Sequence, residues 1–190
     1  MTYITTTATV KADIDFLQQA SSTYSAAFTN LQGSIGYSVG MTGGSGESVL
    51  QSDCIYNLAG YVISSGGTRE YDFRSLSQDA FGSDYTMAMT GLKALVIRNH
   101  NTGVNEILHL KATGLNGFSG LFHGESGNLR IEPGSVYMYT NPYFGINVSA
   151  NESKLQITNV GSGGTGDGST WTGNTGIAIS IVAAGTSGIG

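Results

Sequence analysis

The chain has 190 residues, of which 29 are glycine and only 11% are charged, and its net charge is −5. Charged residues make up about 25% of an ordinary soluble domain, so hydroxyl and amide side chains take much of their place here. The eight Lys and Arg residues are scattered along the chain, which argues against nucleic-acid binding because that mode needs clustered cations that neutralise phosphates.

A surface of this kind suits a protein that is covered by other copies of itself. Burying Ser or Thr costs less free energy than burying Lys or Glu, so a weakly charged surface is easier to cover. A secreted β protein would have the same composition, and composition alone leaves both interpretations open.

The single cysteine and the start of the chain set further limits. Cys54 lies in the segment CIYNLAGYVI, which predicts a buried strand, and a lone cysteine forms no intrachain disulfide. We expect its thiol to be a small core side chain rather than a nucleophile. The chain begins without the basic and apolar regions of a signal peptide, and no apolar run reaches the roughly 18 residues of a membrane helix. We therefore expect synthesis in a reducing compartment and no membrane partner.

Residues 1–12 form a Thr-rich arm, MTYITTTATVKA. Thr and Tyr favour extended structure, so this segment is either a strand or an arm that docks on a neighbouring molecule. We regard its apolar side chains as candidate interface residues, namely Tyr3 and Ile4.

Residues 13–32 carry apolar side chains at alternating spacings of three and four, which is typical of one helix face. Asp13 is placed to cap the start of such a helix and Gly33 its end. Ser and Thr inside the segment oppose a helix, because they compete for backbone hydrogen bonds. A short amphipathic helix and an extended arm both remain open. Five apolar side chains are candidate interface residues in either case, namely Ile14, Leu17, Tyr24, Phe28 and Leu31.

Residues 33–48 are rich in Gly and Ser and predict a loop or linker. We place the domain boundary here, with an N-terminal arm over residues 1–48 and one domain over residues 49–190. No period of 20–50 residues repeats along the chain.

The second part of the chain contains short, mostly alternating or β-branched runs separated by turn signals. They are KALVIRN (93–99), EILHLKAT (106–113), NLRIEPGSVYMYT (128–140), INVSA (146–150), KLQITN (154–159) and IAISIVAA (177–184). Runs at this spacing predict an all-β domain, an antiparallel β-sandwich or jelly roll. The glycine-rich segment 161–176 lies between the last two runs and reads as a long hairpin loop.

No residue pattern predicts catalysis, a metal or a cofactor. His100, His109 and His123 lack the spacing of zinc ligands, and no nucleophile-elbow motif occurs. Glu70 and Asp72 share a strand face, but Arg69 and Arg74 are close in sequence, so ion pairs are a better interpretation than a pair of catalytic acids. We expect no catalytic residue, no metal and no cofactor.

Aromatic side chains are further candidates for contacts. Tyr137 and Tyr139 would share one strand face in SVYMYTNPYFG, and Tyr143 follows them. This stripe is either a packing surface at the core edge or an interface patch. Trp171 lies within the glycine-rich segment and either anchors a protein or sugar contact or folds back onto the sandwich.

The order of segments from Arg69 onward resembles small structural proteins of tailed-bacteriophage virions. The similarity covers residues 69–187, from REYDFRSL through GLKALVIRNHNT and LRIEPGSVYMYTNP to IAISIVAAGTS. It is one of arrangement rather than of a catalytic motif, and residues 1–48 lie outside it. The resemblance implies a β-sandwich that decorates or cements a capsid, commonly as a homotrimer, with the major capsid protein as partner and the virion as location.

Two other functions remain as alternatives at this stage. One is a tail, fibre or spike component of the virion, which would be present in fewer copies. The other is a carbohydrate-binding module that uses Trp171 and the tyrosines as stacking platforms. An enzyme is the weakest hypothesis.

Overall fold

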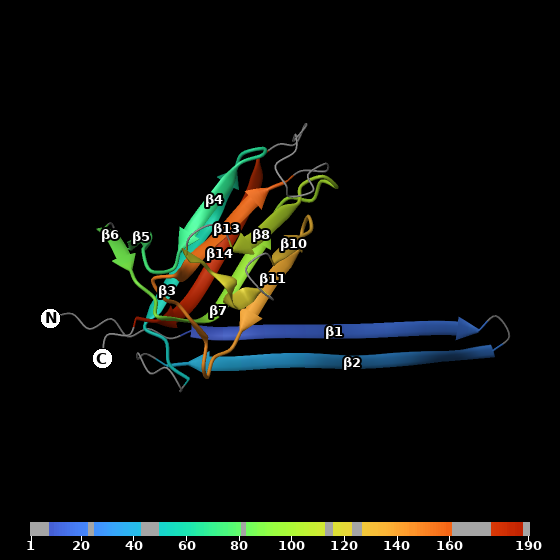
Figure 1. Ribbon diagram of the computed structural model, residues 1–190. Coiled ribbons are helices and arrows are strands. Elements are labelled where there is room, and N and C mark those ends of the chain that lie inside the picture. Colours follow the sequence, from blue (N-terminus) through green and yellow to red (C-terminus); the bar gives the residue numbers. More distant parts are fainter. Residues whose placement is uncertain are drawn as a thin grey trace. The chain divides into compact units, whose positions relative to one another are not determined.

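A computed structural model describes residues 8–22, 25–42, 50–80, 83–112, 116–122, 127–160 and 176–187 (Figure 1). The chain divides into two compact units, one formed by Thr9–Gly40 and one that contains everything from Met41 onward. Within the described residues, no helix has the length and apolar character needed to cross a membrane.

The first unit is a two-stranded sheet made by β1 (Ala8–Ser22) and β2 (Ser25–Met41), whose arrows run in opposite directions in Figure 1. The helix considered for residues 13–32 is therefore wrong, and the extended alternative is correct. The segment also has a period of two, since Ile14 and Phe16 alternate with Asp13 and Asp15. That alternation suits a strand, and the Ser and Thr residues weaken the helix.

The second unit contains a sheet centred on β14, which we call the β14 sheet. Its strand order is β11 (Val136–Thr140), β7 (Gly91–Asn99), β14 (Ile177–Thr186) and β3 (Cys54–Ile63), and β12 (Ile146–Asn147) also pairs with β7. All of these pairs are antiparallel.

The other large sheet is centred on β13, and we call it the β13 sheet. Its order is β10 (Asn128–Ile131), β8 (Leu108–Ala112), β13 (Glu152–Asn159) and β4 (Thr68–Asp72). The short β9 (Asn116–Gly117) pairs in parallel with β13 and leads to a 3-10 helix over Ser119–Leu121. A separate hairpin consists of β5 (Leu76–Ala80) and β6 (Ser83–Met87).

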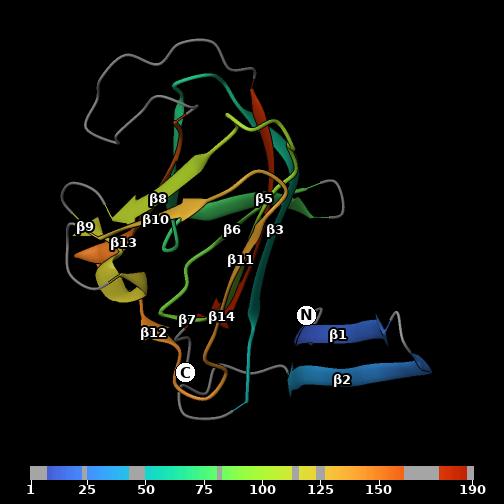
Figure 2. The ribbon, with the colours of Figure 1, turned by 90° about the vertical axis from the view of Figure 1, so that its right-hand side faces the viewer.

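The β14 and β13 sheets lie face to face as two layers (Figure 2). This arrangement confirms the prediction of an all-β sandwich. The prediction of a hairpin across residues 161–176 is wrong, because the strands that precede and follow this segment, β13 and β14, belong to different sheets. The sequences of two successive strands do not indicate whether the strands join the same sheet or different sheets.

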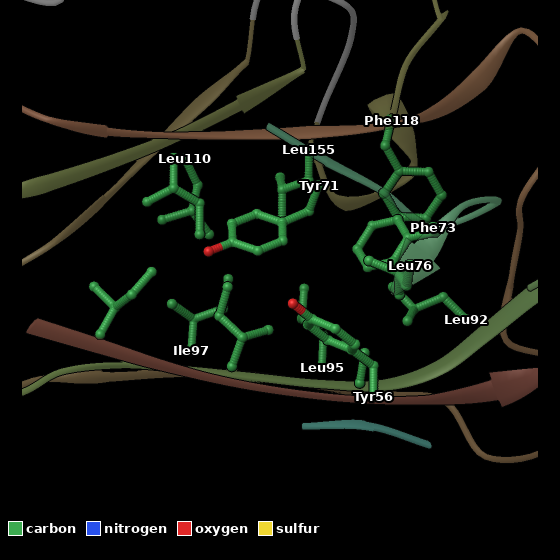
Figure 3. Close-up of a cluster of buried hydrophobic side chains, with 14 of the residues drawn as sticks. Tyr56, Tyr71, Phe73, Leu76, Leu92, Leu95, Ile97, Leu110, Phe118 and Leu155 are labelled. Atoms are coloured by element: carbon green, nitrogen blue, oxygen red, sulfur yellow. The ribbon is translucent and has the colours of Figure 1, made fainter. Parts of the chain in front are cut away.

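The core fills the space between the layers. Inward residues of β14 are buried at every second position, as are Leu95 and Ile97 of β7 and Leu155 and Ile157 of β13. Figure 3 shows rings from both layers meeting there, with Tyr56 of β3 and Tyr71 of β4 edge to face at 6.4 Å between centroids. Phe73 and Phe118, both from the β13-sheet side, lie edge to face at 5.0 Å. Cys54 is buried in this cluster, as predicted. Burial raises the pKa of its thiol to about 12, and the neighbouring Asp53 adds to the effect.

Candidate interaction surface

The outward face of the β13 sheet is polar. The strand register aligns Asn128, Lys111, Gln156 and Glu70 across four strands, and a second row holds Arg130, His109, Thr158 and Thr68. These side chains alternate with the buried positions of their strands. The result is the polar-out pattern expected of an antiparallel sheet with one solvated face.

Two of the charged side chains on this face, Lys154 and Glu70, form an ion pair. Lys154 Nζ lies 2.8 Å from Glu70 Oε1, and the hydrogen bond to Glu70 raises the pKa of Lys154. Ion pairs were expected for Glu70 and Asp72 with Arg69 and Arg74, but the partner of Glu70 is Lys154, from the adjacent strand. Arg69 instead stacks on the rings of Tyr61 and Tyr71, at 5.0 and 5.9 Å.

His109 also lies on this outward face. Burial lowers its pKa, and the neighbouring cations Arg130 and Lys111 lower it further. His100, in contrast, follows β7, and its Nε2 lies 2.7 Å from Ser180 Oγ in a hydrogen bond whose direction depends on the tautomer. His123 lies outside the described residues. Within the described ranges, no group of three His, Cys, Asp or Glu side chains is placed to hold a metal ion.

The outward face of the β14 sheet is apolar. Its register aligns three rows across β11, β7 and β14. The rows are Val136–Arg98–Ser180, Met138–Val96–Val182 and Thr140–Ala94–Ala184. Arg98 is the one charged residue in these rows. On β3, Val62 pairs with Ala178 and extends the face, whereas the exposed polar residue Asn57 pairs with Val182.

Several large apolar side chains on this face are exposed to solvent. The exposed fraction is 56% for Val62, 54% for Val136, 40% for Val182 and 38% for Met138. Their neighbours in sequence point inward, since Tyr137, Ile97 and Ile181 pack in or against the core. We call Val62, Val96, Val136, Met138 and Val182, together with the alanines between them, the β14 face.

The predicted tyrosine stripe lies on the opposite side of β11 from the β14 face. Tyr137 and Tyr139 share one strand side, as expected, and that side packs against the core. Burial raises the pKa of both hydroxyls. Tyr143 is exposed in the turn after β11, beside Phe144, which is 73% exposed.

The remaining candidate residues belong to the N-terminal region and the glycine-rich segment. Ile14 and Leu17 lie in β1, and Phe28 and Leu31 lie in β2. The others fall outside the described residues, namely Tyr3, Ile4, Tyr24 and Trp171. Their role as interface residues stays a prediction.

The sequence did contain a signal for the β14 face that the tyrosine-based prediction missed. The run ALVI within KALVIRN is continuously apolar and IAISIVAA is interrupted only by one serine, whereas a strand with one solvated face alternates apolar and polar residues. A strand with apolar side chains on both sides needs cover on both sides. In this sandwich only the inner side is covered by the second layer.

A shallow hollow of about 150 Å³ lies between the edge strands β10 and β11. Arg130 and Glu132 contribute to its lining, and their side chains are ion-paired with each other at 2.7 Å. The hollow therefore offers a ligand little free charge.

Comparisons of the chain with protein-family models, curated proteins and solved structures found no match.

Proposed function

We propose that the chain is a structural virion protein that decorates or cements a bacteriophage capsid through subunit–subunit contacts. The observation that carries the proposal is the β14 face, an apolar and nearly uncharged sheet surface on a domain whose other sheet is polar outside. Exposed apolar patches are among the features that mark protein–protein contacts. The virion location comes from the resemblance of residues 69–187 to phage structural proteins.

The N-terminal hairpin of β1 and β2 supplies a second element for assembly. It is a sheet of only two strands, 15 and 17 residues long. A two-stranded sheet is marginally stable in water, and a third strand or a packed layer is needed for stability. We propose that the hairpin docks on the capsid, where strand addition would supply main-chain hydrogen bonds.

The test is quantitative mass spectrometry of purified particles of the phage whose genome encodes the chain, followed by imaging of the same particles. We expect many copies per particle, distributed over the capsid. A few copies at the tail would support the tail, fibre or spike alternative instead. Particles that lack the chain would contradict a structural virion role.

A carbohydrate-binding function is the second candidate, and one observation favours it. Tyr143 and Phe144 expose two adjacent aromatic side chains in one turn, and sugars stack on exposed aromatic rings. Glycan-array binding that is lost in Tyr143→Ala and Phe144→Ala would support this function. Binding of no glycan by the wild-type protein would remove it.

A further inference from the structure

We infer that the β14 face is the contact between two copies of this chain, packed sheet on sheet about a two-fold axis. The inference names the partner of one surface and does not depend on the virion role. The β13 sheet shows how this chain builds an outer face for solvent. That face carries ion-paired and hydrogen-bonded polar side chains, including Lys154 with Glu70 and Thr68 with Thr158.

The size of the β14 face suits the apolar centre of a protein interface. Four strands at a spacing of about 4.8 Å, over five residues at about 3.4 Å each, cover about 300 Å² of flat sheet, and this area includes the polar residues Arg98, Ser180, Thr140 and Asn57. Apolar patches of a few hundred Å² are the largest found on typical monomers and are often functional. A stable interface buries about 800 Å² on each partner, so this face would need a surrounding rim.

Polar residues available for that rim lie in the two rows on either side of the central row Met138–Val96–Val182. Arg98 and Ser180 occupy the row with Val136, His100 bonds to Ser180, and Thr140 ends the row on the other side. An apolar centre with a polar rim is the usual composition of a protein–protein interface.

The shape and chemistry of the face indicate what covers it. Its side chains are short or branched and stand on a regular sheet, which is the surface that another sheet packs against at a spacing of about 10 Å. Of the two sandwich faces in the described part of the chain, the outer β13 face would bring Glu70, Lys154 and Lys111 into an apolar contact, and their desolvation would cost free energy. The β14 face of a second copy brings no charged side chain into the central row of the contact, and Arg98 lies in the row beside it.

Packing identical faces also closes the assembly. A two-fold contact uses the same surface on both partners, so no copy of the β14 face is left exposed. A two-fold axis that runs across the strands at the level of Val96 and Val182 places the two Arg98 side chains at opposite ends of the contact. Like charges are then kept apart, and each valine of the central row faces its own copy.

The first experiment measures the mass of the full chain in solution by light scattering at micromolar concentration. We expect the mass of two chains for the wild type and of one chain for Val182→Lys, since a lysine at the centre would be buried without a partner. The matched control is Gln156→Lys, at the centre of the polar outer β13 face, which should keep the mass of two chains. Far-UV circular dichroism of both variants checks that the sheets are retained.

Three results would overturn the inference. They are a wild type with the mass of one chain, an oligomer that survives Val182→Lys, and an assembly of three chains, which is the homotrimer implied by the resemblance. The outcome is separable from the virion proposal, because particle composition is measured independently of the mass in solution.

The second experiment uses the wild-type protein alone, so it stands even if Val182→Lys fails to fold. Met138 is partly exposed on the β14 face, whereas Met41, Met87 and Met89 are buried in the core. Peroxide converts accessible methionine to its sulfoxide. We expect Met138 to be protected at high protein concentration and to become at least several-fold more reactive when the protein is diluted into single chains. Rapid oxidation at every concentration would overturn the inference, as would protection that persists in single chains.

Discussion

The two sheets of the sandwich share one core but have different outer faces. The β13 sheet presents Glu70, Lys111, Gln156 and Lys154, and the β14 sheet presents Val62, Val96, Val136, Met138 and Val182 in place of such polar residues. The few charged residues of the chain are therefore unevenly distributed between the outer faces of the two sheets. The difference teaches that a chain with few charged residues can place them on one outer face, which suits solvent, and leave the other outer face apolar, which suits contact with a protein.

The largest effect is expected from a change in the core that the two sheets share, because it should destabilise both sheets together. Leu95 is fully buried in β7, and Leu95→Ala leaves a cavity in the shared core, which should lower the free energy of unfolding by about 2–5 kcal/mol. Urea unfolding followed by circular dichroism and by tyrosine fluorescence should show the sandwich lost in one transition. Leu95→Met is the matched control and should cost less than about 1.5 kcal/mol. Separate transitions for the two sheets would contradict a shared core.

A smaller effect should follow from a change directed at the β14 sheet alone. A Cβ added at Gly185 would overlap with the carbonyl oxygen of Gly91, so Gly185→Ala must separate β14 from β7 at that end. We expect a loss of about 1–3 kcal/mol in the free energy of unfolding. In Gly40→Ala, a control in β2, the added methyl group meets no atom within 4 Å. Equal stability of the two variants would show that the close approach is not needed.

A still smaller effect is expected on the polar face. Glu70→Gln removes the ion pair with Lys154, whose two side chains are both partly exposed. Exposed pairs contribute about 0.2–1 kcal/mol, and salt screens them. A double-mutant cycle with Lys154→Met, measured at low and high salt, isolates the coupling between the two side chains. Coupling that does not weaken in salt would mean that this face is less solvated than we describe.

The smallest effect concerns the pH dependence of the polar face. Because the pKa of His109 is lowered in the folded chain, the unfolded chain binds the proton more readily below a pH of about 6.5. Stability should therefore fall as the pH drops from that value to the lowered pKa of the folded state. His109→Gln should reduce this fall. Thermal melts between neutral pH and pH 5 measure it, and a melting temperature of the wild type that rises on acidification would contradict the assigned direction.

The sequence predicted the all-β sandwich because alternation and turn residues are local properties. KLQITN and EILHLKAT have the pattern of strands with one solvated side, and they form β13 and β8. The same local information was ambiguous for residues 13–32, where a spacing of three and four coexists with a period of two. Pairing between β1 and β2 decided between the two, since a strand gains its hydrogen bonds from a partner rather than from itself.

The sequence by itself determined the class of fold, the burial of Cys54 and the low charge of the surface. The apolar runs within IAISIVAA and KALVIRN also indicated that some strands are apolar on both sides. Only the tertiary structure decided which sheet each strand joins, and therefore that Tyr137 and Tyr139 pack inward while Val136 and Met138 face out. The physical reason is that strand partners are set by contacts between distant segments. A shift of a single residue in register would exchange the two faces of every strand.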